Sequence, residues 1–484
     1  MVGSITSRIR IEFIGRIIAT GSSSLLLVFL ARTLSPDEYG TLFLTISLLT
    51  FSEIFARAGI GKSAARYLSE FRGEAISLEA DIIKVSLLFT LSTTGIMCLL
   101  LYLLRFRISM WFGEPYLADL ILIGVPYVIF STLLKYSRSV LQGYESISNA
   151  AKINVTNKVL RLLSVISLVL FGYEALGALF GYVIGFFISS ITGIYYILKI
   201  ASFGIISEHQ PKEDISKKIL KYALPISITS TGYALDKKVD TIIIGYLLNP
   251  AAVSFYTLGK QIVTFLELPA QALGFTISPL YSSEDSELPP SKIYEEAIVN
   301  SIYIYVPISS GLLIISEPTV LLLFGQEYLP AADILKVFSF YIIAQSLLHI
   351  TGDGLDFLGR AKARSLSRVG TAFLNVGLNF VLVPYFGVIG ASFATVFTTY
   401  IYACINISIM LSEIDINKIK TIKRIAIAFF PSIIMSIATV YLVDFANSIG
   451  MLLVVILISS GIWTIISLQI GMISSEEIKR LAEI

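Results

Sequence analysis

Residues 176–199 read LGALFGYVIGFFISSITGIYYILK, and Lys199 at the end is the only charged residue of the stretch. A helix needs about 20 apolar residues to cross the hydrocarbon core of a bilayer. The run is continuous, whereas a membrane β-barrel strand would alternate apolar and polar residues. The stretch therefore predicts a transmembrane helix, and much of the chain repeats this pattern.

The composition of the whole chain points the same way. Its 484 residues are 55% hydrophobic and 14% charged, whereas a soluble domain carries about 25% charged residues. The net charge of +2 indicates no nucleic-acid partner. Cys98 and Cys404 both fall in apolar runs, so we expect buried thiols and neither a disulfide framework nor a metal site.

Fourteen apolar segments are long enough to span a membrane, which predicts an all-α polytopic membrane protein. Their approximate bounds are 11–34, 40–60, 82–104, 116–141, 153–173, 176–199, 219–248, 252–281, 294–316, 331–352, 364–384, 388–411, 422–444 and 448–470. The spans 219–248 and 252–281 exceed what the bilayer needs, so we expect them to tilt, to protrude or to bend at Pro225 or Pro269.

The distribution of Lys and Arg predicts the orientation. With the N-terminus inside, the cytoplasmic side holds 28 of the 36 Lys and Arg residues and the outer side holds four. Cytoplasmic loops carry such an excess, so we expect both termini in the cytoplasm and the chain in the cytoplasmic membrane. The segments 61–81 and 284–296 mix charged and apolar residues and are candidates for short interfacial helices.

A shift of 214 positions aligns residues 36–70 with residues 250–284 without a gap, and several identities result, among them Glu53 with Glu267. Because a charged residue inside a membrane helix is costly, the paired glutamates carry more weight than apolar matches. Chance similarity between hydrophobic stretches is the alternative. The repeat predicts a six-helix lobe at 1–207, a second at 208–412 and two appended helices at 413–484.

Four motifs together resemble a known family. They are LSPDEYG at 34–40, LQG at 141–143, IIIGYLL at 242–248 and VPYFGVIGA at 383–391. In this order, and with this helix layout, they resemble the polysaccharide-transporter family of lipid-linked oligosaccharide flippases, within the multidrug/oligosaccharidyl-lipid/polysaccharide exporter superfamily.

The resemblance implies that the chain turns a polyprenyl-(pyro)phosphate-linked glycan from the cytoplasmic to the outer face by alternating access of two lobes. It implies no cofactor beyond a coupling Na⁺ or H⁺. The expected partners are the lipid-linked glycan, the bilayer and downstream glycan-processing enzymes. A multidrug or cation antiporter of the same superfamily is one alternative. A membrane-embedded glycan polymerase or ligase is another, although the short outer loops argue against an enzyme.

Polar stripes on two helices predict the substrate cavity. Lys260, Thr264, Glu267 and Gln271 recur at spacings of 4, 3 and 4, and Thr50, Glu53 and Arg57 stand at matching positions in the first half. An alternative is a Glu53–Arg57 pair that merely packs between helices. The predicted cavity residues are Arg16, Thr50, Glu53, Arg57, Lys237, Lys260, Thr264, Glu267 and Gln271.

Asp236, Asp240, Asn375 and Asn379 are predicted to bind the coupling ion, because carboxylate and amide oxygens suit Na⁺ and a carboxylate can take up a proton. The alternative is a salt-bridge cluster neutralised by Lys237 and Lys238.

Other polar groups receive plainer interpretations. Lys135, Arg138, Lys158 and Arg161 could form a basin for an anionic pyrophosphate, but the positive-inside rule already predicts cations there, and we favour that interpretation. We interpret His349 as a packed core histidine and not as a proton relay. The stretch 56–63, ARAGIGKS, matches a permissive phosphate-loop pattern, but a true phosphate loop follows a buried strand. This stretch ends a transmembrane span, so we do not expect ATP hydrolysis.

Overall fold

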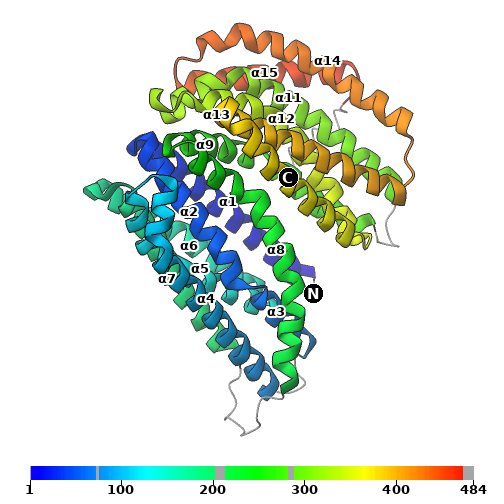
Figure 1. The fold of residues 1–484 in the computed structure, drawn as a ribbon. Coiled ribbons are helices and arrows are strands. Elements are labelled where there is room, and N and C mark those ends of the chain that lie inside the picture. Colours follow the sequence, from blue (N-terminus) through cyan, green and yellow to red (C-terminus); the bar gives the residue numbers. More distant parts are fainter. Residues whose placement is uncertain (1, 72–75, 202–212, 282–287, 473–484) are drawn as a thin grey trace. The chain divides into compact units, whose positions relative to one another are not determined.

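The computed structural model describes residues 2–71, 76–201, 213–281 and 288–472, and every regular element in these ranges is helical (Figure 1). The longer helices are α1 (Val2–Thr33), α2 (Pro36–Arg57), α3 (Ile60–Glu70), α4 (Ile76–Phe112), α5 (Tyr116–Gly143), α6 (Ile147–Leu168), α7 (Glu174–Ile200), α8 (Glu213–Leu247), α9 (Pro250–Leu266), α10 (Leu268–Ile277), α11 (Pro290–Phe324), α12 (Ala331–Phe357), α13 (Ala361–Glu413), α14 (Lys418–Leu442) and α15 (Ile449–Gln469).

Within the described ranges, nine helical segments are long and apolar enough to cross a membrane. Two of them are double length. The segment 147–200 turns at Gly172, with φ 86°, through the π-helical element η1 (Val169–Tyr173), and α13 turns at Gly387, with φ 58°. Each of the two therefore holds two of the predicted spans. The all-α membrane fold is confirmed, and the count of fourteen spans stays a prediction.

Several local expectations can be compared with the structure. Residues 60–70 do form a short helix, α3, whereas residues 290–296 open the long helix α11 instead of an interfacial helix of their own; residues 284–287 lie outside the described ranges. Pro225 sits within continuous α8, and the expected bend occurs instead beside Pro269, between α9 and α10. Cys98 is buried as expected, but Cys404 is exposed on α13, because an apolar helix directs part of its circumference to lipid.

The helix bounds extend the internal repeat along the chain. The first residues of α2, α4 and α6 are Pro36, Ile76 and Ile147, and those of α9, α11 and α13 are Pro250, Pro290 and Ala361, a constant offset of 214. The ends of α5 and α12, Gly143 and Phe357, keep the same offset. Chance similarity of apolar sequence would not hold these four boundaries in register, so the structure favours a genuine repeat.

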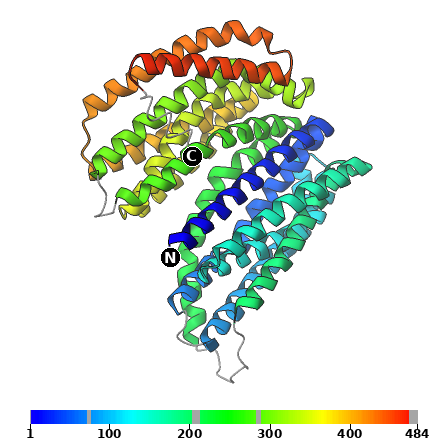
Figure 2. The same cartoon turned by 180° about the vertical axis from the view of Figure 1, so that it is seen from behind.

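The chain divides into two compact units, residues 1–254 and 255–484. In the first, α7 packs on α5 and α6, and α1 runs alongside α6 (Figure 2). Helix α8, which the repeat assigns to the second half, packs against α2, α3 and α4 in this unit. In the second, α12 lies against α11 and α13. Of the two C-terminal helices, α14 packs on α11 and α15 packs on α14. The lobe boundaries predicted from the sequence stay a prediction.

Small residues bring the helices of the first unit close together. A Cβ added at Gly181 on α7 would lie 2.7 Å from the Cα of Val165 on α6, and one at Gly185 would lie 2.9 Å from the Cβ of Arg161. Membrane helices use small residues in this way, because lipid is as apolar as their side chains and close packing supplies the attraction. By contrast, a Cβ at Gly95 on α4 would meet nothing within 4 Å.

These contacts predict opposite effects for one chemical change at two glycines. Gly181→Ala should lower the stability of the protein by about 1–3 kcal/mol, because overpacking forces α6 and α7 apart. Gly95→Ala should be neutral or stabilising by up to about 1 kcal/mol, since it only removes the conformational freedom of glycine in a helix. Thermal unfolding in detergent micelles measures both, and equal melting temperatures would contradict the tight packing at Gly181.

Candidate functional site

Glu53 on α2 is fully buried and is held by two cations. Its carboxylate oxygens lie 2.7 and 2.8 Å from the Nζ of Lys135 on α5, and Oε1 lies 3.3 Å from the Nε of Arg57, one turn along α2. A buried carboxylate needs such partners because an uncompensated charge is costly in an apolar interior. The predicted Glu53–Arg57 contact exists. Lys135, which the sequence analysis explained by the positive-inside rule alone, makes the shorter contact with Glu53.

The two cations beside Glu53 also line a pocket in the first unit. The pocket has a volume of about 250 Å³. Its described lining includes four cations, Arg57, Lys62, Lys135 and Arg138, and no acidic side chain. Uncharged polar groups complete much of the wall, namely Thr90, Thr132, Ser139 and Gln142. The pocket therefore has the chemistry of an anion site, since Lys and Arg bind phosphate through charge-assisted hydrogen bonds.

The turn from α2 into α3 shapes one side of this pocket. Ala58 and Gly59 both have positive φ, 42° and 69°, and α3 begins at Ile60. A Cβ at Gly59 would lie 2.7 Å from the carbonyl oxygen of Ala223, so both the backbone conformation and the close approach of α8 favour glycine here. The phosphate-loop-like stretch 56–63 is thus a reversal between two helices, and it delivers Arg57 and Lys62 to the pocket wall.

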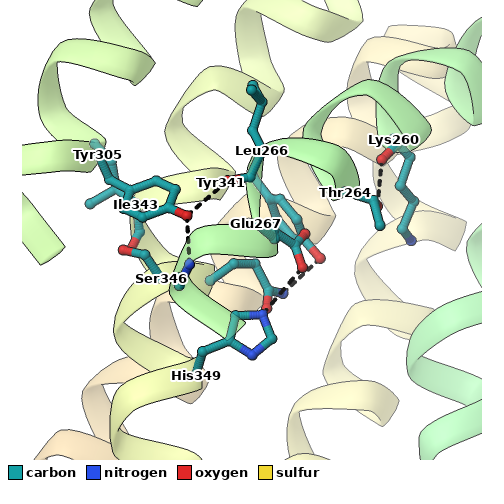
Figure 3. Close-up of polar contacts among 11 residues, drawn as sticks. Lys260, Thr264, Leu266, Glu267, Tyr305, Tyr341, Ile343, Ser346 and His349 are labelled. Atoms are coloured by element: carbon teal, nitrogen blue, oxygen red, sulfur yellow. Dashed lines mark hydrogen bonds and ion pairs between the residues drawn. The ribbon is translucent and has the colours of Figure 1, made fainter. Parts of the chain in front are cut away.

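Glu267 forms a second buried carboxylate site, in the second unit. It is 3% exposed and occupies the break between α9 and α10. Its Oε2 lies 3.3 Å from Nε2 of His349 on α12, and Figure 3 shows the two side chains pointing toward each other. His349 is therefore not simply a packed core histidine, because its ring contacts a buried carboxylate.

The two carboxylate pairs occupy equivalent positions in the repeat. Glu53 and its partner Lys135 are 82 residues apart, and Glu267 and its partner His349 are also 82 residues apart. The offset of 214 that relates the two glutamates therefore also places His349 where the first half has Lys135. Each half builds the same acid–base contact between corresponding helices, with a lysine in one and a histidine in the other.

The other predicted cavity residues have varied surroundings. The hydroxyls of Thr50 and Tyr127 are 3.3 Å apart. Lys260 donates to the hydroxyl of Tyr256 at 3.3 Å and lies over its ring. Thr264 is exposed and donates to the carbonyl oxygen of Lys260. Gln271 lies on α10, beyond the break, so the stripe that Lys260 and Thr264 begin on α9 does not continue along one regular helix.

Two of the predicted ion ligands meet on α13. The side-chain amide of Asn379 donates to the side-chain oxygen of Asn375 at 3.0 Å, and that of Asn375 donates to Thr398 at 3.3 Å. Asp240 is 1% exposed on α8, in the first unit. The side chains of Arg16, Asp236 and Lys237 lie outside the described part of the structure, so their predicted roles stay predictions.

Three pocket cations were absent from the predicted cavity, namely Lys62, Lys135 and Arg138. A signal for two of them exists in the sequence, since Lys135, Arg138 and Gln142 follow a spacing of 3 and 4 that places them on one helix face. Positive-inside topology predicts cations at this end of α5, but it does not predict the contact between Lys135 and Glu53. That contact depends on which faces of α2 and α5 meet.

Comparison with known proteins places the chain in a family. The polysaccharide biosynthesis protein family matches residues 29–333, well over half of the sequence. The chain belongs to this family. One curated relative of this family member is the probable low-salt glycan biosynthesis flippase Agl15 of Haloferax volcanii, 25% identical over 388 residues that cover 79% of the present chain and 78% of the relative.

Solved structures show that the fold of this family member recurs. The lipid II flippase MurJ, in an inward closed conformation, matches with a TM-score of 0.76 and 18% identity over 96% of this chain and 98% of its own. A multidrug resistance transporter of the MATE family, in an inward-facing conformation, matches with a TM-score of 0.67 and 14% identity over 86% and 98% of the two chains. At such low identities the two matches establish the fold alone.

The Glu53–Lys135 contact predicts a non-additive pair of variants. Lys135→Met should lower stability by about 3–5 kcal/mol, because it leaves a buried carboxylate short of its nearest cation. Adding Glu53→Gln should recover most of that loss, since the double variant buries no uncompensated charge. Urea or thermal unfolding in micelles provides the measurement. A double variant less stable than Lys135→Met would show that the pair is not what balances Glu53.

Proposed function

We propose that this protein flips a polyprenyl-(pyro)phosphate-linked oligosaccharide or polysaccharide repeat unit from the cytoplasmic to the outer face of the membrane. The observation that carries the proposal is the basic pocket of the first unit, with Arg57, Lys62, Lys135 and Arg138 in its described wall. The family membership and the flippase relative support the same substrate class.

The size of the pocket indicates which part of the substrate it would receive. Its volume of about 250 Å³ is below the ~300–1,000 Å³ of pockets that enclose drug-sized ligands. It therefore suits a diphosphate group and is too small for an oligosaccharide. Glu53 removes part of the positive charge at the inner wall, so the pocket would attract the anion without holding it irreversibly.

The orientation that we propose gives the pocket its place in the cycle. We place the chain in the plasma membrane with both termini in the cytoplasm. Helices α2 and α5 then run toward the cytoplasm, and their C-terminal ends, with Arg57 and Arg138, lie in the cytoplasmic half of the membrane. A lipid-linked glycan made on that side would present its diphosphate there while its tail stays in lipid. Alternating access of two lobes would then release the headgroup outside, with Arg16, Lys237 and Lys260 as further contacts.

Energy for directed transport would come from an ion gradient. Carboxylate and amide oxygens at Asp236, Asp240, Asn375 and Asn379 remain our candidates for Na⁺ or H⁺. Membrane potential can contribute as well, at about 2.3 kcal/mol per charge per 100 mV. Downstream glycan-processing enzymes, as partners that consume the product, would also draw the cycle forward.

A cationic-drug antiporter is the second candidate, because a multidrug transporter of the MATE family has a similar fold. The charge of the pocket opposes it, because four cations would repel a cationic drug at short range. A polymerase or ligase receives no support from the similar proteins named above, which are flippases and a transporter.

Removing two pocket charges tests the proposal. Lys62→Gln with Arg138→Gln should slow flipping of a fluorescent polyprenyl-diphosphate-linked N-acetylglucosamine in proteoliposomes at least tenfold, because hydrogen bonds to charged groups are worth about 1.5–3 kcal/mol each. Protection of the fluorophore from dithionite reports flipping.

The matched control is Lys152→Gln, which removes an exposed cation of α6 that is absent from the pocket wall. Flipping by this variant should stay within twofold of wild type, and inorganic diphosphate should inhibit both. Equal rates for the pocket variant and the control would overturn the proposal, as would efflux of ethidium in place of flipping.

A further inference from the structure

The surroundings of Glu267 differ from those of Glu53 in one respect that matters for protons. Both carboxylates are buried, but Glu53 faces Lys135 and Arg57, whereas the one ion-pair partner of Glu267 among the described residues is His349. The second oxygen, Oε1 of Glu267, is buried without a hydrogen-bond partner in the described part of the chain. A negative charge there is poorly compensated, and binding of a proton would remove it.

Histidine is the side chain whose ordinary charge change falls between about pH 5 and 8. A proton that reaches the pair through His349 can therefore come to rest on the Glu267 carboxylate, and the net charge of the pair then passes from −1 to zero. Glu53 differs in having two basic side chains beside it, Lys135 and Arg57. The repeat thus provides corresponding carboxylates with different basic partners, and only the partner in the second half is a histidine.

The groups around the pair neither fix its charge nor isolate it. Tyr305 approaches from α11, Tyr341 and Asp353 flank His349 along α12, and Lys260 lies two turns back on α9. From α13, the guanidinium of Arg364 lies beside Gly352 but is paired with Asp356. Lys260 contacts Tyr256, Arg364 is paired with Asp356 and Arg368 of α13 lies over the ring of Tyr402, so each of these cations has a contact of its own.

Polar residues on α12 connect the pair to the end of that helix. Tyr341, Gln345, His349 and Asp353 recur at intervals of four, so they lie along one face. Gln345 donates to the Tyr341 hydroxyl at 2.6 Å, and Asp353 lies half-buried one turn beyond His349. In the orientation proposed above, Asp353 is on the cytoplasmic side, where it can exchange protons with water.

The backbone beside Glu267 can bend. The hydroxyl of Tyr305 donates to the carbonyl oxygen of Leu266 at 2.8 Å and accepts from the amide of Ala270 at 3.0 Å, so it stands inside a bond that a regular helix would close directly (Figure 3). Pro269 removes a further backbone donor. A side chain inserted into the helix ladder marks a kink, and here the kink adjoins the carboxylate.

We propose that Glu267 and His349 form a proton-binding site and that its occupancy controls the bend between α9 and α10. The role of this site in transport rests on the proposed flippase function. In that role, the proton would be the coupling ion, and it would bind in the second half of the repeat. Proton uptake removes the buried charge that draws Glu267 toward His349, and the Tyr305 hydroxyl can then leave or re-enter the break as the helix straightens or bends.

Proton binding can be measured without transport. Difference infrared spectra of the purified protein in liposomes, recorded across pH 5–8 (about the ordinary histidine range), should show a protonated-carboxyl band. Glu267→Gln should abolish it. The matched control, Glu53→Gln combined with Lys135→Met, should retain it. A band unaffected by Glu267→Gln, or absent from the wild type, would overturn the proposed site.

A reciprocal substitution tests coupling. His349→Lys gives the second half the glutamate–lysine pair that the first half already accommodates, so we expect a folded protein with a fixed charge. In proteoliposomes with an imposed pH gradient, wild-type flipping of the same fluorescent polyprenyl-diphosphate-linked probe should change at least fivefold between gradient directions, and His349→Lys should change less than twofold. His349→Gln, which cannot change charge, should behave likewise and serves if the lysine variant misfolds. Equal gradient responses in wild type and both variants would overturn the coupling role.

The two readouts separate the proton site from the proposed function. A Glu267-dependent infrared band in a protein that moves no lipid-linked glycan would support the proton site and overturn the flippase proposal. The opposite result is a wild-type protein that lacks the band and flips the probe at a rate independent of the pH gradient, while the pocket variant does not flip it. That result would support the flippase proposal and overturn the proton site.

Discussion

The cost of placing a carboxylate among apolar membrane helices governs the two sites of this protein. Glu53 and Glu267 are both almost completely buried, and each needs a basic group from the corresponding helix of its half to be tolerated there. This requirement fixes which face of α2 meets α5, and which face of α12 meets the break between α9 and α10. The basic pocket follows in the first unit, because the cations that balance Glu53 also reach its wall.

The repeat lets the same geometry serve two purposes. Because the two halves share one offset, each glutamate faces the same position of its partner helix. The chemistry of each pair therefore depends on the side chain at that position, Lys135 in one half and His349 in the other. Lysine in water stays charged at physiological pH, and in our functional proposal the first half attracts an anion. Histidine does not, and the second half acquires a group that responds to protons. If both proposals hold, related positions separate substrate attraction from energy coupling.

The sequence was sufficient for the architecture and for part of the sites. Long apolar runs predicted the helices, because crossing lipid leaves little choice of secondary structure, and the paired glutamates revealed the repeat. Glu53 and Arg57 could be linked through helical spacing. The contacts of Lys135 and His349 could not, since partners 82 residues away depend on helix packing. The break at Glu267 was anticipated from Pro269, whereas the inserted Tyr305 hydroxyl required coordinates.

The offset shared by several helix bounds also bears on the history of the chain. If a gene duplication produced the two halves, insertions and deletions before these bounds have since been absent or compensated, while most residues of the aligned stretches 36–70 and 250–284 have diverged. Selection then acted on length more strictly than on identity, as expected when helix ends must meet the same two water–lipid boundaries. Diversification of cargo in such a frame proceeds by point substitution, and an exchange as small as lysine for histidine can give one half a task that its twin does not perform.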